Sequence, residues 1–179
     1  QVEQLNPDLI VLAGDLFERR SNIKEIIPVM KKFDAPFGVW AVRGNHDTVR
    51  SGRKDVTGEI LKKADIPLLS NENKSPLPGL VIAGVDDFTS SRRHPGKAEA
   101  DLETALENKP EGLVILISHT PWMAEQAADA GVDLMISGHT HNGQIWPFNY
   151  LVKSQYPYIT GLYTIDEMLL CVSKGTGTW

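Results

Sequence analysis

The chain has 179 residues, of which 41% are hydrophobic and 7% aromatic, a size that suits one domain with a continuous buried core. Its 18 Lys and Arg residues against 23 Asp and Glu residues give a net charge of -5, which argues against a protein that binds duplex nucleic acid. The single cysteine, Cys171, excludes an internal disulfide framework, and no apolar run reaches the roughly 18 residues that cross a bilayer. We expect one domain over residues 1–179 that is soluble as given.

The first part of the chain alternates strand-like and helix-like segments. Residues 8–14 form a short apolar run that ends in glycine, as buried strands do. Residues 22–33 then place apolar side chains at helical spacing after the N-cap candidate Asn22. Residues 37–42 are strand-like again, and a second helix follows that ends before Pro67.

The second part continues this alternation and then changes in character. Strands are expected at residues 80–85, 113–118 and 133–137, with helices near residues 97–107 and 123–130. After Gln144 the chain becomes rich in aromatic residues and proline, which predicts a long loop. Residues 158–165 and 169–173 flank Asp166-Glu167 and are expected to form antiparallel strands around a tight turn.

Side chains that can bind a metal follow directly on the ends of predicted strands. They are Asp15, Asn45, His46, Asp47, His119 and His139. Ligands of α/β proteins bind at the carboxyl ends of strands, where glycine lets the backbone turn sharply. His139 and His141 are two residues apart, so both imidazoles leave an extended segment from the same face. A mixture of carboxylate, amide and imidazole donors suits Mn, Fe, Zn or a similar ion and not a thiolate site.

Taken singly, most of these motifs have a purely structural explanation. The Gly-Asp pair at 14–15 is common as a turn or a helix cap, and the polar segment 44–47 as a turn. His119 alone fits a hydrogen-bonded loop histidine. Only the Gly-His-Thr-His segment 138–141 favours a metal site by itself. The aromatic residues of 146–158 fit core packing as well as a substrate groove or a peripheral contact with a membrane surface.

Together and in this order, the motifs of residues 14–141 resemble those of the calcineurin-like metallophosphoesterase superfamily, which run D-x-H, G-D, G-N-H-[DE], H and G-H-x-H. The flanking sequences PDLIVLAGD and GHTHNGQ look most like a bacterial branch of often membrane-associated phosphohydrolases. Asn142 stands where that branch commonly has glycine, and asparagine tolerates the left-handed backbone that this place requires. The D-x-H motif, which normally lies on the first strand, is absent. Because the chain also opens at Gln1 and stops at Trp179 as if cut, we expect the domain to be incomplete at the N-terminus and at the C-terminus.

The resemblance implies an α/β fold, a layered β-sandwich of mixed sheets flanked by helices, that acts as a metal-dependent phosphoesterase with two divalent ions. The implied metal ligands are Asp15, Asn45, His119, His139 and His141. Asp15 would bridge the two ions, and His141 would belong to the second of them. His46 would protonate the leaving oxygen, with Asp47 beside it to orient or tune the ring. A hydroxide that bridges the ions would attack the phosphodiester or phosphomonoester.

Two other hypotheses come from different classes. A metallo-β-lactamase-like hydrolase needs H-x-H-x-D-H, whereas His141 is followed here by Asn-Gly-Gln. A catalytically inactive binding scaffold of the same fold is the alternative function, and the retention of the polar residues at the strand ends argues against it. Lipid-linked and nucleotide-like phosphate esters are both open as substrates. The resemblance is compatible with a bacterial protein in the cytoplasm or at the membrane.

Overall fold

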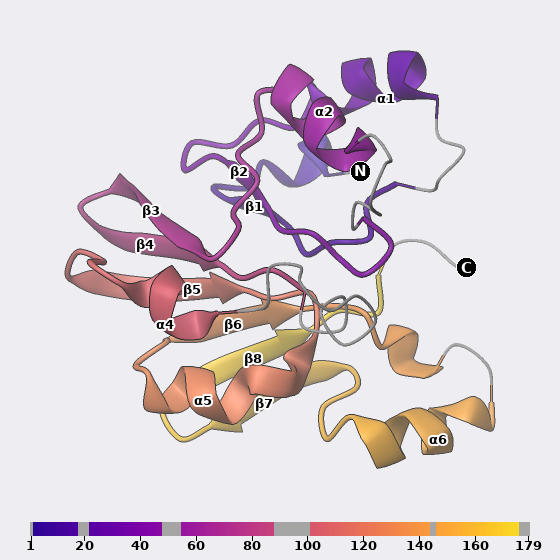
Figure 1. Ribbon diagram of the computed structural model, residues 1–179, viewed down its shortest axis with the longest axis vertical. Coiled ribbons are helices and arrows are strands. Elements are labelled where there is room, and N and C mark those ends of the chain that lie inside the picture. The colour runs from indigo at the N-terminus through magenta and orange to yellow at the C-terminus, as the bar shows by residue number, and fades with distance from the viewer. Residues whose placement is uncertain (1, 18–21, 48–54, 88–100, 144–145, 176–179) are drawn as a thin grey trace.

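The computed structural model describes residues 2–17, 22–47, 55–87, 101–143 and 146–175, whose strands form two sheets (Figure 1). The smaller sheet pairs β1 (Ile10–Leu12) with β2 (Val39–Ala41) in parallel. The larger sheet has the order β3-β4-β5-β6-β8-β7, and its strands are β3 (Glu72–Leu77), β4 (Gly79–Gly84), β5 (Gly112–Ile117), β6 (Leu134–Ser137), β7 (Gly161–Ile165) and β8 (Met168–Val172).

The direction of the strands brings their carboxyl ends to one edge of the larger sheet. Strands β4, β5, β6 and β8 run parallel, and only the outer strands β3 and β7 are antiparallel to their neighbours. Gly84 at the end of β4 lies opposite Ile117 at the end of β5, and Ile117 in turn lies opposite Ile136 of β6. Residues that follow these strands therefore emerge side by side.

Helices and sheets stack in layers that are separated by three apolar clusters (Figure 1). Helices α1 (Ile23–Met30) and α2 (Val56–Lys63) pack on the outer face of the smaller sheet, whose residues Val39 and Ala41 point toward them. Trp40 and Val42 point the other way, toward the larger sheet, because side chains alternate along a strand. Helices α4 (Leu102–Leu106) and α5 (Ala124–Asp129) cover the far face of the larger sheet. The predicted layered α/β fold of mixed sheets and helices is confirmed.

Most predicted elements are present, with shorter bounds. The side chain of Asn22 caps α1 by accepting a hydrogen bond from the Lys24 N–H at 3.2 Å, as expected, but α1 ends at Met30 and not at residue 33. The hairpin of β7 and β8 turns at Asp166, where the prediction placed it. Of the helix predicted near 97–107, residues 97–100 lie outside the described residues. Single turns of 3-10 helix occur at Glu3–Leu5, Pro121–Met123 and His141–Gly143.

Two segments differ from the prediction. The long loop expected after Gln144 was wrong, because α6 (Phe148–Gln155) lies there. Pro147 and Pro157 counted as loop signals, but Pro147 occupies the N-cap of α6 and Pro157 lies beyond its end, and proline is tolerated at both places. Strand β3 was missed because its sequence is polar and contains proline, a composition that is confined to outer strands. Among the described residues no helix is long and apolar enough to cross a bilayer.

Candidate metal centre

Four polar side chains meet where the ends of the two sheets adjoin. Each follows a strand: Asp15 after β1, Asn45 after β2, His119 after β5 and His139 after β6. The Nε2 atom of His119 lies 3.2 Å from Asp15 Oδ2, 3.1 Å from Asn45 Oδ1 and 3.1 Å from His139 Nδ1. The ligand atoms of Asp15, His119 and His139 all lie within 4.8 Å of one another. The structure therefore brings together four of the residues that the sequence selected.

The hydrogen bonds around His119 determine where its ring can carry a hydrogen and where it can bind a cation. Its Nδ1 lies 2.7 Å from the carbonyl oxygen of Ala13, and a carbonyl can only accept, so Nδ1 carries a hydrogen. In the neutral ring Nε2 then has a lone pair, which faces the oxygens of Asp15 and Asn45. Lone pairs that face one another repel, and either a proton on Nε2 or a shared metal ion removes this repulsion. Ligand atoms at about 2.1 Å from one ion are about 3.0–3.4 Å apart in octahedral or tetrahedral geometry, and the observed separations fit that range.

Glycine is required on both loops of the smaller sheet because the loops approach each other closely. A Cβ atom on Gly14, which has φ of +87°, would lie 2.6 Å from the Gly44 nitrogen and 2.7 Å from His119 Nδ1. A Cβ atom on Gly44 would collide with the Asp15 carboxyl group. The glycines of the G-D and G-N-H-D motifs thus let the loop after β1 and the loop after β2 approach each other more closely than residues with a Cβ atom would allow.

Several residues of the site hold a left-handed backbone. The φ angles are 52° at Asp15, 68° at His139, 46° at His141 and 54° at Asn142. Such conformations are unfavourable for residues with a Cβ atom and gather at functional sites, where the surrounding structure imposes them. The expectation that Asn142 takes a left-handed conformation in place of glycine is confirmed.

The charges of the cluster favour a bound cation. Burial raises the pKa of Asp15, but the hydrogen bond and charge of His119, together with the His46 N–H, outweigh it and lower the pKa below 3.8. Burial lowers the pKa of His119, but the hydrogen bond and charge of Asp15 outweigh it and raise the pKa above 6.5. For His139, burial and the charge of His119 lower the pKa to about 4. At neutral pH Asp15 is thus ionised and His139 is neutral, which are the forms that bind a metal.

The Asp47 carboxylate is buried and binds the loops that carry the cluster. One oxygen accepts hydrogen bonds from the Gly44 N–H at 3.0 Å and the Leu16 N–H at 3.3 Å, and the other accepts from Thr57 Oγ1 at 2.9 Å. Burial raises the pKa of Asp47 above 3.8 against these hydrogen bonds. These hydrogen bonds connect the loop after β1 to the loop after β2, so the Asp47 carboxylate can position the backbone that carries Asp15 and Asn45.

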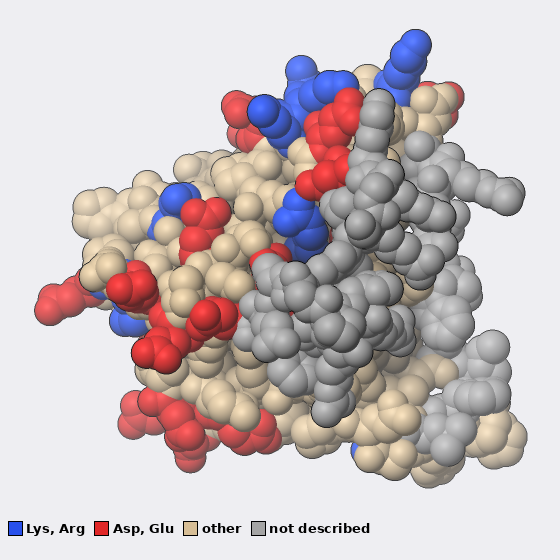
Figure 2. Space-filling model, viewed as in Figure 1, with Lys and Arg blue, Asp and Glu red and all other residues tan. Residues whose placement is uncertain are grey.

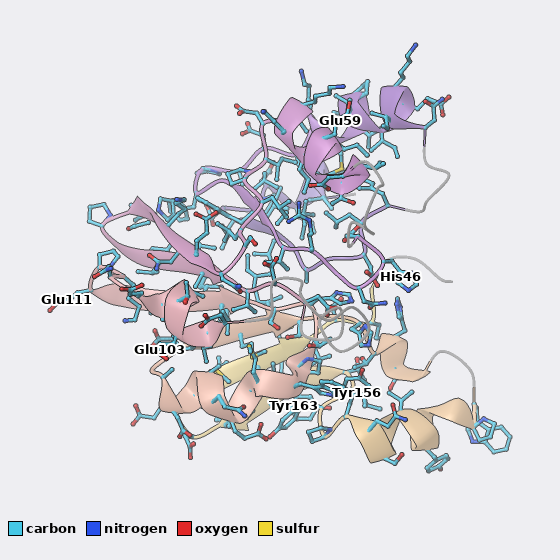
Figure 3. The ribbon with its side chains drawn as sticks, in the orientation of Figure 1. His46, Glu59, Glu103, Glu111, Tyr156 and Tyr163 are labelled. Atoms are coloured by element: carbon cyan, nitrogen blue, oxygen red, sulfur yellow. The ribbon has the colours of Figure 1, made fainter. Side chains whose placement is uncertain are left out.

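His46 and His141 are not among the described residues whose ligand atoms lie within 4.8 Å of one another. His46 is exposed at the edge of the sheets where the strands end, and its backbone N–H donates to Asp15 Oδ1 at 2.8 Å (Figure 3). His141 Nδ1 lies 3.2 Å from the carbonyl oxygen of Lys174, so Nδ1 is the donor and Nε2 carries the lone pair in the neutral ring. On the face shown in Figure 2, acidic side chains gather over α4 and α5, away from His46.

The sequence did not assign two residues that lie beside the cluster to the metal centre. Asp87 is 2% exposed and follows β4 by three residues, and its charge acts to raise the pKa values of His119 and His139 against burial, which lowers them. The rule that located the other residues, a polar side chain just after a predicted strand, applies to Asp87 as well. Tyr156 contacts His139 through its hydroxyl group at 2.8 Å. The sequence placed Tyr156 only among the aromatic residues of 146–158, which fit core packing, a substrate groove or a membrane contact, and not at the metal centre.

This fold and this cluster define an α/β protein with a candidate divalent-metal centre at the carboxyl ends of its strands. Residues 1–143 match the family of calcineurin-like phosphoesterases, so the chain belongs to that family. The predicted resemblance is confirmed.

Relatives and solved structures agree with this assignment. A metallophosphoesterase of Campylobacter jejuni is 32% identical over all of this chain and 48% of its own length. A transmembrane protein with metallophosphoesterase domain of Danio rerio is 33% identical over 98% of this chain and 43% of its own length. The chain thus spans about half the length of these curated relatives. The crystal structure of a calcineurin-like phosphoesterase from Bacillus subtilis superposes with a TM-score of 0.55 at 17% identity, over 96% of this chain and 69% of that one, which shows the shared fold.

Proposed function

We propose that the protein hydrolyses phosphodiesters or phosphomonoesters with two divalent metal ions and that Asp15, Asn45, His119 and His139 hold one of them. The convergence of three ligand atoms on His119 Nε2, at 3.1 to 3.2 Å, is the observation that carries this proposal. Mixed oxygen and nitrogen donors suit Mn, Fe or Zn. When bound, such ions supply Lewis acidity at the phosphoryl oxygen and lower the pKa of water.

The second ion is assigned to Asp15 and His141. Asp15 Oδ2 faces His119, whereas Oδ1 accepts from the His46 N–H, so the carboxylate presents both oxygens at the edge of the cluster and is suited to bridge. The lone pair of His141 is on Nε2, because Nδ1 donates to the Lys174 carbonyl oxygen. Two protein ligands bind an ion less firmly than four, so we expect the first ion to be held more tightly.

His46 is proposed as the group that protonates the leaving oxygen. Its side chain is exposed next to the cluster, while its backbone is fixed to Asp15, so the ring can reach a substrate without being a ligand. Asp47 would then position the loop that carries His46 through its bonds to Gly44 and Leu16.

The experiment is hydrolysis of bis(p-nitrophenyl) phosphate and p-nitrophenyl phosphate by the chelator-stripped protein, before and after addition of Mn. We expect turnover only after Mn is added, and none in the matched variant His119→Gln, which removes the central ligand and keeps a polar side chain. Turnover that survives chelation contradicts the proposal. If the protein binds Mn and hydrolyses neither ester, the binding-scaffold alternative is favoured.

A further inference from the structure

The hydroxyl group of Tyr156 touches the candidate metal ligand His139 on the side away from the cluster. Tyr156 Oη lies 2.8 Å from His139 Nε2, whereas His139 Nδ1 faces His119 Nε2 at 3.1 Å. Tyr156 is 8% exposed, so water does not compete freely for this contact. One ring nitrogen of His139 thus faces the cluster and the other contacts Tyr156.

Packing fixes the tyrosine in this place. The Tyr156 ring stacks on Trp122, with centroids 5.1 Å apart and planes at 24°, and Trp122 follows His119 by three residues. The Tyr156 ring also lies 5.5 Å from the His139 ring. Its backbone N–H donates to the Val152 carbonyl oxygen at 2.9 Å, at the end of α6. The tyrosine is therefore held between the loops that carry two of the ligands.

The direction of the Tyr156–His139 hydrogen bond determines which nitrogen of His139 can bind a cation. Neutral imidazole carries one hydrogen, either on Nδ1 or on Nε2. If Nε2 donates to the tyrosine oxygen, the lone pair is on Nδ1 and points into the cluster. If Nδ1 carries the hydrogen instead, that hydrogen points at His119 Nε2 and the ring cannot bind an ion there. Partners of this kind set the tautomer and the orientation of metal-binding histidines.

We propose that Tyr156 is a positioning residue of the metal centre, which accepts a hydrogen bond from His139 Nε2 and thereby holds the Nδ1 lone pair and the ring orientation ready for a divalent ion. The inference rests on the metal centre proposed above, since it concerns one of its ligands. It gives α6 a function, because this helix delivers Tyr156 to the site. Loss of such a partner weakens metal binding by about 10–100-fold in other proteins.

The test uses Tyr156→Phe, which keeps the aromatic ring on Trp122 and removes only the hydroxyl group. Tyr158→Phe is the matched control, because its hydroxyl group donates to Glu125 at 2.9 Å outside the cluster. Calorimetric titration of the metal-free protein with Zn should show binding weaker by about 10–100-fold in Tyr156→Phe and changed by less than about twofold in Tyr158→Phe. Thermal unfolding of the metal-free proteins checks that both variants fold.

Nitrogen-15 NMR of the histidine rings provides a measurement that a purely packing role would not change. In the metal-free wild type we expect His139 with its hydrogen on Nε2, and in Tyr156→Phe a mixture of the two tautomers. If the wild type binds Zn and Tyr156→Phe keeps both the affinity and the tautomer, the positioning role is refuted while the metal centre stands. If the wild type binds no Zn, the metal centre fails and this inference fails with it.

Discussion

Replacing Asp47 separates the structural role of its carboxylate from its charge. In Asp47→Ala the buried Gly44 N–H and the part-buried Leu16 N–H lose their acceptor, and the Thr57 hydroxyl group loses its partner. Each buried donor that loses its partner destabilises the protein by about 1–3 kcal/mol, and removal of the buried Asp47 charge offsets part of the total loss. We therefore expect a loss of about 2–4 kcal/mol in the free energy of unfolding, which lowers Tm by about 4–16 °C for a chain of this size.

The matched variant is Asp47→Asn. Its amide oxygen can accept from both backbone N–H groups and its NH2 group can donate to Thr57 Oγ1, so stability should stay within about 1 kcal/mol of the wild type. The pKa of Asp47 is raised in the folded protein, so protonation favours folding. As the pH falls through that raised pKa toward 3.8, the wild type should gain stability relative to Asp47→Asn. Urea unfolding over this pH range measures both effects. Equal losses in the Ala and Asn variants, or a loss below about 1 kcal/mol for Ala, would refute the role as a tie between loops.

Three further predictions concern the metal centre. The pKa of His119 is raised above 6.5 and that of His139 is about 4, so ion binding at pH 6 should release about one proton, from His119, and affinity should increase with pH until His119 is deprotonated. Calorimetry in buffers of different ionisation enthalpy measures the number of protons released, and a release of two protons would contradict this prediction. His46→Asn should lower kcat by about 10²–10⁴-fold with metal content unchanged, less so for esters with acidic leaving groups, and metal loss would instead make His46 a ligand. Gly14→Ala should abolish tight metal binding, because the new methyl group would lie 2.7 Å from His119 Nδ1. The control Gly131→Ala, also at positive φ but with open space around it, should keep tight binding. Equal affinities of the two variants in a metal titration would contradict the requirement for glycine at position 14.

The sequence could predict the cluster because one rule covers its members. Buried parallel strands are continuous apolar runs, and residues just beyond them share one edge of the sheet. Asp15, Asn45, His119 and His139 satisfy this rule without any knowledge of long-range contacts. Asp87 satisfies it too, and it was missed because no family motif drew attention to it.

Features that depend on tertiary packing could not be predicted in this way. Tyr156 reaches His139 from the C-terminal end of α6, and α6 lies between Pro147 and Pro157 in a segment whose composition predicted a loop. The backbone at His139 and His141 also differs from the expectation, because both residues are left-handed and the segment is not the extended one that was expected to place both imidazoles on one face. Strand β3 depends on its pairing with β4 and not on its own polar sequence.

The central claim, that Asp15, Asn45, His119 and His139 bind a divalent ion, is tested most directly by elemental analysis of the protein after dialysis against Mn and then against metal-free buffer. Atoms of Asp15, Asn45 and His139 lie 3.1 to 3.2 Å from His119 Nε2, and His141 is assigned to a second ion. We therefore predict about one tightly held ion per chain in the wild type and close to none in His119→Gln. A wild type without Mn, or a His119→Gln variant that retains as much Mn as the wild type, would contradict the account.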